Sequence, residues 1–197
     1  MDLTMQEGVE RLSREPEYVL AFRQAFGREI QEEDPARALA SYVSTILSGD
    51  SPYDRLLAGR PDALSPEAQE GLRIFRGKSN CSACHAGPHL TDEGFHNTGV
   101  ASRDGRWLDA GRFAVTGIEA DLGKFKTPSL REVARTAPYM HDGSIPSLEE
   151  VIEYYDRGGN RNPRLDQGVK PLHLSAEEKH ALANFLRSLS GRVAEGL

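Results

Sequence analysis

The chain of 197 residues has only two cysteines, Cys81 and Cys84, and His85 follows the second directly in the stretch "SNCSACHAGPHL". Three chemistries could use this Cys-x-x-Cys-His spacing: a redox dithiol, a zinc site or a covalently bound haem. A thioredoxin-like dithiol belongs in a βαβ unit, and no such pattern surrounds this one. A zinc site needs four ligands. His89 or His96 could add to the cysteines, but no second close ligand pair follows at a typical distance.

Haem c is the chemistry that this spacing favours. Two thiols so placed can add across both vinyl groups of a porphyrin, and the adjacent histidine can bind the iron. We therefore expect Cys81 and Cys84 to hold one covalent haem c and His85 to be the proximal iron ligand. Zinc stays as the alternative.

The iron then either takes a second axial ligand, for electron transfer, or leaves that position open to oxygen or peroxide. Spacing alone favours Met140, the only methionine after the haem motif, although a methionine that fills a gap in the core is the commoner case. The candidates downstream of the motif are Met140, His96, His141, His173, Tyr154 and Tyr155.

The segments that must position these residues have the pattern of capped helices. Ser65 as N-cap and Pro66 at the first helical position begin a helix that leads to Cys81. The segments "SLEEVIEYYDRGG" and "SAEEKHALANFLRSLSG" each begin with a capping box, at Ser147 and Ser175. The first and last of these three helices could cross as the terminal helices of cytochrome c do.

Two further helices are expected before residue 58, at 16–27 and 34–49, the second with Asp34 as N-cap and Pro35 after it. One apolar stripe follows the second helix: Leu39, Tyr42, Val43, Ile46 and Leu47. Residues 87–127 predict a long irregular loop, and no strand pattern is found. We predict an all-α protein: a cytochrome c-like haem domain with long irregular loops at 59–197, preceded by extra N-terminal helices at 1–58.

Composition and charge exclude some functions. The formal charge of −6 argues against nucleic acid as a partner, because phosphate binding needs a basic face. No apolar run approaches the ~20 residues that cross a bilayer. The polar, acidic start "MDLTMQEGVERLSREPE" does not have the pattern of a secretory signal.

Several runs resemble one family: "FHNTGV", "GRFAVTG", "FKTPSLREVARTAPYMHDGS" and "LEEVIEYYDRGG", with "ALASYVSTILSGDSPYDRLLAG" upstream. They resemble the bacterial di-haem cytochrome c peroxidase and MauG superfamily over most of residues 35–190. That family has two cytochrome c-like domains: peroxide reacts at the N-terminal haem, and the C-terminal haem transfers electrons. The chain resembles the C-terminal domain with the helices that precede it.

The resemblance also implies a distal ligand. In the peroxidase branch a methionine lies late in the helix after the "PYxHDG" turn, and in the MauG branch a tyrosine lies there. "SLEEVIEYY" places Tyr155 at this position, so we expect Tyr155 to bind the iron. Met140 falls inside the turn, where we expect it to pack, and it stays the second candidate. Tyrosinate stabilises oxidised iron, whereas methionine raises the potential.

Two further features follow from the resemblance. The family binds Ca²⁺ between its domains, partly through backbone carbonyls that correspond to Thr136 and Pro138, and the partner ligand belongs to the other domain. The glutamate that acts as acid–base catalyst in the peroxidase branch corresponds to Val43. We therefore do not expect this chain alone to cleave peroxide by that route.

Four other residues are expected near the haem. His141, Asp142 and Arg131 are expected to bond propionates or loop carbonyls. Trp107 could relay electrons or, as the ordinary alternative, plug the haem crevice.

The function predicted is that of the haem c electron-transfer domain of a di-haem peroxidase or MauG-like protein, which relays electrons to or from a second, peroxide-reactive haem. At the family level this is a peroxidase-type oxidoreductase. The alternatives are a stand-alone mono-haem cytochrome c without enzymatic activity and a zinc-stapled helical domain. The partners expected are a second haem domain or a redox protein, with a second copy of the chain as a further candidate. Haem attachment outside the cytoplasm implies a periplasmic protein.

Overall fold

The computed structural model of the chain describes residues 3–195, which divide into two compact units. The larger unit is Ser48–Arg192, and the smaller one comprises the residues up to Leu47 with those from Val193 on. The sequence-based boundary after residue 58 differs from this division. Helix α4, Pro52–Leu57, belongs to the larger unit because Tyr53 is buried in its core, where its ring meets Phe185 edge-on at 5.5 Å.

The smaller unit consists of the helices α1 (Met5–Leu12), α2 (Pro16–Phe26) and α3 (Glu33–Ser44). Helix α3 begins before Asp34, so the prediction of Asp34 as N-cap is wrong. Asp34 is fully buried, and its carboxylate accepts hydrogen bonds from the Arg28 guanidinium at 2.6 and 2.9 Å and from the Gln31 N–H at 2.9 Å. The Asp34 carboxylate therefore binds the Arg28 guanidinium, which lies outside α3, and does not cap the helix as the sequence pattern predicted.

Short strands correct the prediction that the chain has none. Strand β1 (Leu47–Gly49) pairs with β6 (Arg192–Ala194), β2 (Phe95–His96) with β5 (Phe125–Lys126), and β3 (Ser102–Arg103) with β4 (Arg106–Trp107). Strands of two or three residues are too short to show an alternating pattern, which explains why sequence periodicity missed them.

Helices form the frame of the larger unit. Besides α4 these are α5 (Pro66–Arg76), α6 (Phe113–Thr116), α7 (Leu148–Asp156) and α8 (Ala176–Arg187). Single-turn 3-10 helices lie between them: η1 (Pro61–Ala63), η2 (Cys81–Ala83), η3 (Glu119–Asp121) and η4 (Val133–Arg135). The N-caps expected at the starts of α5, α7 and α8 are confirmed, since each serine side chain accepts a backbone N–H three residues on.

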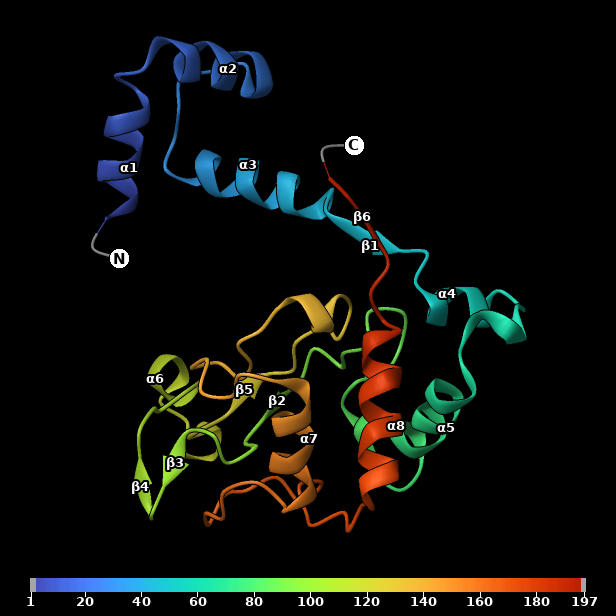
Figure 1. Ribbon diagram of the computed structural model, residues 1–197. Coiled ribbons are helices and arrows are strands. Elements are labelled where there is room, and N and C mark those ends of the chain that lie inside the picture. The colour runs from blue at the N-terminus through green and yellow to red at the C-terminus, as the bar shows by residue number, and fades with distance from the viewer. Residues whose placement is uncertain (1–2, 196–197) are drawn as a thin grey trace. The chain divides into compact units, whose positions relative to one another are not determined.

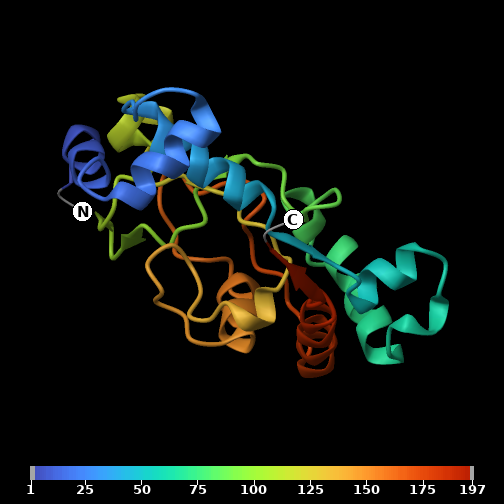
Figure 2. The same cartoon turned by 90° about the horizontal axis from the view of Figure 1, so that it is seen from above.

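Helices α5 and α8 cross at close range, as the sequence predicted. A Cβ on Gly71 of α5 would lie 2.0 Å from the carbonyl oxygen of Ala181 of α8, so the backbones touch where the glycine has no side chain. Phe75 and Phe185 pack beside this crossing with ring centroids 5.0 Å apart. Helix α8 lies between α5 and α7 in both views (Figure 1, Figure 2). The buried core of the larger unit is centred on this helix trio.

Among residues 3–195, none of the helices combines the length and the apolar character that crossing a bilayer requires.

Candidate haem site

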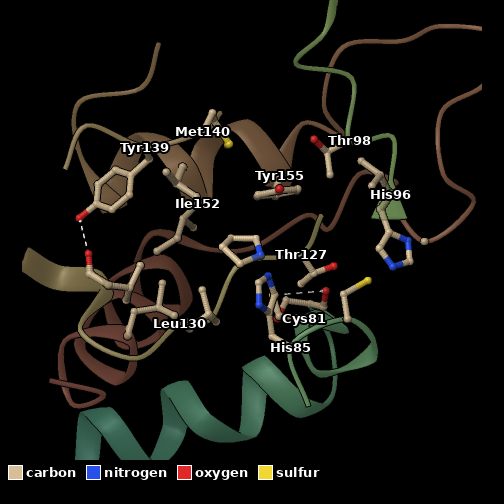
Figure 3. Close-up of a pocket in the computed structure, with 18 of the residues that line it drawn as sticks. Cys81, His85, His96, Thr98, Thr127, Leu130, Tyr139, Met140, Ile152 and Tyr155 are labelled. Carbon is tan, nitrogen blue, oxygen red and sulfur yellow. Dashed lines mark hydrogen bonds between the residues drawn. The ribbon is translucent and has the colours of Figure 1, made fainter. Parts of the chain in front are cut away.

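A cavity of about 450 Å³ opens in the larger unit, between the haem motif and α7. Figure 3 shows Cys81 and His85 on one side of it, next to the end of α5 and η2, and Tyr155 and Met140 on the opposite side, next to α7. His96 lines a third side. Leu130, Ile152 and other apolar side chains complete the walls. This volume and character are typical of a pocket that buries a large, mostly apolar ligand.

His85 is prepared to bind a metal. Its Nδ1 lies 3.0 Å from the carbonyl oxygen of Leu90, which can only accept, so Nδ1 carries the proton and Nε2 is the nitrogen with a lone pair for a metal. Burial lowers the pKa of the His85 imidazole, which favours the neutral form that coordinates metal ions.

The two cysteines are held by a tight turn. The carbonyl of Cys81 accepts the N–H groups of Cys84 at 3.3 Å and His85 at 2.9 Å, and all three side chains line the cavity. Burial raises the pKa of both thiols. A redox-active Cys-x-x-Cys has the opposite property, a lowered pKa at its nucleophile. This environment disfavours the dithiol chemistry and fits thiols that end in thioether bonds.

The adjacent tyrosines of α7 have different surroundings. Tyr155 lines the cavity, and burial, as the main cause, raises the pKa of its phenol despite a hydrogen bond with the Thr98 side chain. The Tyr154 hydroxyl instead bonds the backbone: it donates to the Thr98 carbonyl at 2.9 Å and accepts the Asn160 N–H at 3.2 Å. The structure therefore brings Tyr155 to the site and leaves Tyr154 outside it.

Met140 also lines the cavity, with a left-handed backbone at φ 71° inside the turn that precedes α7. Both proposed distal ligands thus reach the same space. His141 lines it as well, stacked on Phe125 at 3.6 Å between ring centroids. The remaining candidate, His173, is exposed and lies outside the cavity lining.

The expected calcium residues, Thr136 and Pro138, lie at the cavity rim and are exposed. The Thr136 hydroxyl donates to the Val133 carbonyl at 3.2 Å. The Asp142 carboxylate accepts the Ser144 N–H at 3.0 Å within the same turn.

Arg131 lies outside the cavity lining. Its guanidinium bonds the Asp54 carboxylate at 2.9 and 3.0 Å, and its Nε donates to the Pro88 carbonyl at 2.8 Å. The expected bond to a loop carbonyl is therefore present. The Trp107 ring covers Gly123, where a Cβ would lie 2.3 Å from it, and Trp107 is not a plug of the cavity.

Sequence reasoning missed a charged cluster in the cavity wall. His96 Nδ1 lies 2.7 Å from an Asp166 carboxylate oxygen, and His96 Nε2 lies 2.8 Å from one of Asp92. The Cys84 sulfur lies within 4.8 Å of the ligand atoms of Asp92 and His96. Cys84, Asp92 and His96 are the group of side chains that comes closest to a zinc site. Both nitrogens of His96 already bond carboxylates, however, so neither has a lone pair for a zinc ion.

Comparisons with known proteins agree with this fold. A model of the di-haem cytochrome c peroxidase family matches residues 1–62, and a model of RoxA-like, cytochrome c-like proteins matches residues 124–159. Methylamine utilization protein MauG of Methylorubrum extorquens is 39% identical over 196 residues, which cover 98% of this chain and 55% of that protein. Cytochrome-c peroxidase IdrP1 of a Pseudomonas species is 38% identical over 210 residues, which cover 91% of this chain and 55% of that protein.

The solved structure of the diheme peroxidase BthA from Burkholderia thailandensis has the same fold. It superposes with a TM-score of 0.71 over 96% of this chain and 60% of that one, at 20% identity. A crossed helix pair beside a cavity lined by Cys-x-x-Cys-His defines a cytochrome c-like haem protein. The chain belongs to the MauG and di-haem cytochrome c peroxidase superfamily. It spans about half the length of the curated relatives it matches.

Proposed function

We propose that the larger unit carries one covalent haem c and serves as an electron-transfer domain, which relays electrons to or from a second, peroxide-reactive haem. The observation that supports this most is the convergence of Cys81, Cys84, His85 and Tyr155 on one cavity, with the proton of His85 held on Nδ1 by the Leu90 carbonyl.

In this proposal each residue has a defined task. Cys81 and Cys84 anchor the porphyrin through thioether bonds. His85 gives Nε2 to the iron while the Leu90 carbonyl fixes its ring. A haem held in this way supplies one-electron redox chemistry.

Tyr155 is proposed as the distal ligand and Met140 as the alternative. The raised pKa of Tyr155 means that its phenol stays protonated in the protein alone, so a nearby cationic metal would have to draw off the proton. The resulting anionic oxygen favours ferric iron. Such a centre suits the sharing of oxidising equivalents with a neighbouring haem better than it suits accepting electrons from a high-potential donor.

The second haem is proposed to belong to a separate domain or redox protein. Two observations support a partner. The relatives are almost twice as long as the chain, and α3 exposes 65% of Leu39, 50% of Tyr42 and 60% of Val43. Val43 also stands where the peroxidase branch has its acid–base glutamate, so peroxide cleavage is assigned to the partner.

A mono-haem electron carrier is the second candidate function. One observation favours it: every residue proposed to hold the haem lies within Ser48–Arg192, so the site is complete in one unit. Peroxide alone does not separate the two functions, because neither a carrier nor an isolated relay domain should turn it over rapidly. Addition of a peroxidatic haem domain separates them, because only a relay domain should then support peroxide turnover.

Two further proposals depend on the family. The carbonyls of Thr136 and Pro138 would supply part of a Ca²⁺ site that a second domain completes, since calcium accepts carbonyl oxygens readily. The protein would act in the periplasm, where bacteria attach haem c.

The decisive experiment is expression with the c-type maturation machinery. We expect a red protein with a Soret band, a pyridine haemochrome spectrum of a c-type haem and a mass raised by one porphyrin. The Cys81→Ala/Cys84→Ala variant is the matched control and should retain no covalent haem. A colourless, unmodified wild-type protein from cells that mature another cytochrome c would overturn the proposal.

A further inference from the structure

Asp92, His96 and Asp166 form a charged clasp beside the haem motif. Each ring nitrogen of His96 lies within 2.8 Å of a carboxylate oxygen. Since a carboxylate only accepts, both nitrogens donate, and the ring is an imidazolium. The pKa of His96 is raised because its two carboxylate bonds outweigh the desolvation that would lower it. The clasp therefore carries two negative charges and one positive charge.

The surrounding chain is built to form this clasp. A Cβ on Gly94 would lie 2.9 Å from an Asp92 carboxylate oxygen and 3.0 Å from His96 Nε2, so the glycine leaves the space that their hydrogen bond needs. Asp92 also accepts the Gly94 N–H at 2.8 Å, and Asp166 accepts the Gly168 N–H at 2.9 Å. Three segments meet here: the loop after the haem motif, β2 and the loop after α7.

The clasp lies at one edge of the cavity. His96 and Asp166 both line the cavity, and the Cys84 sulfur lies within 4.8 Å of the facing atoms of Asp92 and His96. Three lysines lie nearby. Lys126 pairs with Glu93, Lys124 pairs with Asp121 and also attracts the Asp166 carboxylate, and Lys170 lines the cavity. These lysines are the same in the wild type and in every clasp variant, so a difference in potential between the variants reports the charge of the clasp.

We propose that the net negative charge of Asp92, His96 and Asp166 lowers the reduction potential of the haem held by Cys84. Reduction moves one electron from the donor to ferric iron and removes one positive charge from the site. A net negative charge at the haem edge stabilises the ferric form, and His96 limits this effect by cancelling one of the two carboxylates. The inference rests on the proposed function, because it needs the haem.

The test is spectroelectrochemistry of the holoprotein near pH 6, where the imidazolium is retained. His96→Gln leaves both carboxylates uncompensated and should lower the midpoint potential. Asp166→Asn leaves one carboxylate balanced by the imidazolium and should raise it. We expect each change to alter the reduction equilibrium about tenfold, which is ~59 mV for one electron.

The double variant His96→Gln/Asp166→Asn shows whether the shifts in potential come from the net charge of the clasp or from the loss of its structure. It breaks the clasp more completely than either single change, yet it has the net charge of the wild type. We expect its potential to return to near the wild-type value. Two shifts in the same direction, no shift, or a double variant displaced further than both single variants would refute the inference.

Matched controls lie outside the cavity. Asp104→Asn removes an exposed carboxylate in the β3–β4 turn, and His180→Gln replaces an exposed histidine on α8. Neither should move the potential. The failures are distinguishable: absence of covalent haem in the wild type refutes the proposed function, whereas a haem-loaded protein with potentials insensitive to the clasp refutes only the electrostatic role.

Discussion

Gly71 of α5 and Ala181 of α8 touch backbone to backbone, with 2.0 Å between the place of a glycine Cβ and the alanine carbonyl oxygen. A real Cβ cannot occupy that position, so a side chain at residue 71 must push the two helices apart. Because α5 leads directly to the haem motif, the distance between these helices also sets where Cys81 lies.

We predict that Gly71→Ala destabilises the protein by about 3 kcal/mol, in the range of an overpacked core. Chemical denaturation followed by circular dichroism measures the loss. Gly8→Ala is the matched control: this helical glycine in α1 has only a Leu3 methyl at 3.7 Å from the added Cβ. It should keep or slightly increase stability through helix propensity. Equal stabilities of the two variants would contradict the role given to the crossing.

Substitution of the two tyrosines of α7 by phenylalanine should have opposite effects on the EPR spectrum and on stability. If Tyr155 is the distal ligand, as proposed, Tyr155→Phe should remove it from the His85-bound haem and change the low-temperature EPR spectrum of the oxidised protein, with little loss of stability. Tyr154→Phe removes bonds to the Thr98 carbonyl and the Asn160 N–H, so it should cost about 1–2 kcal/mol and leave the EPR spectrum unchanged.

Met140→Leu tests the alternative ligand in the same measurement. Leucine keeps the volume and removes the sulfur, so the spectrum should stay as in the wild type if tyrosine binds the iron. A spectrum altered by Met140→Leu and untouched by Tyr155→Phe would assign the ligand to the methionine.

Local signals in the sequence predicted much of this protein. The serines that begin α5, α7 and α8 act through atoms a few residues away, and the haem motif is contiguous, so their patterns can be seen without a structure. The crossing of α5 and α8 followed from two amphipathic helices around a haem motif, but the glycine that permits the contact gave no local signal.

The parts that sequence reasoning missed depend on distant partners. Asp166 meets His96 across 70 positions of the chain, and Arg131 meets Asp54 across 77. Asp34 has the residue type and place of an N-cap, and its burial against Arg28 is set by the turn before α3. The His96–Asp166 and Asp54–Arg131 pairings are decided by the folded path of the chain, so no short window of sequence contains both members. Arg28 lies only six positions before Asp34, but the residue types alone do not tell whether Asp34 caps the helix or binds this arginine.

An ion pair between Asp54 and Arg131 joins α4 to the segment before η4. The hydrogen bond from the Arg131 guanidinium, more than any other contact, lowers the pKa of Asp54 from 3.8 to about 2. A carboxylate with a depressed pKa stabilises the folded state fully above its unfolded value, and this contribution is lost as the pH falls through the folded value. The pair should therefore matter at neutral pH and lose its effect between about pH 4 and pH 2.

We expect Asp54→Asn to lower the free energy of unfolding by about 1 kcal/mol at pH 7, a modest value because water partly screens the pair. The difference from wild type should shrink steadily below pH 4, as urea denaturation at a series of pH values would measure. Asp50→Asn is the control, since its bonds to Arg55 are exposed and should contribute little. A loss for Asp54→Asn that stayed constant down to pH 2 would show that the variant acts through packing or the α4 cap, and that the ion pair with Arg131 contributes nothing.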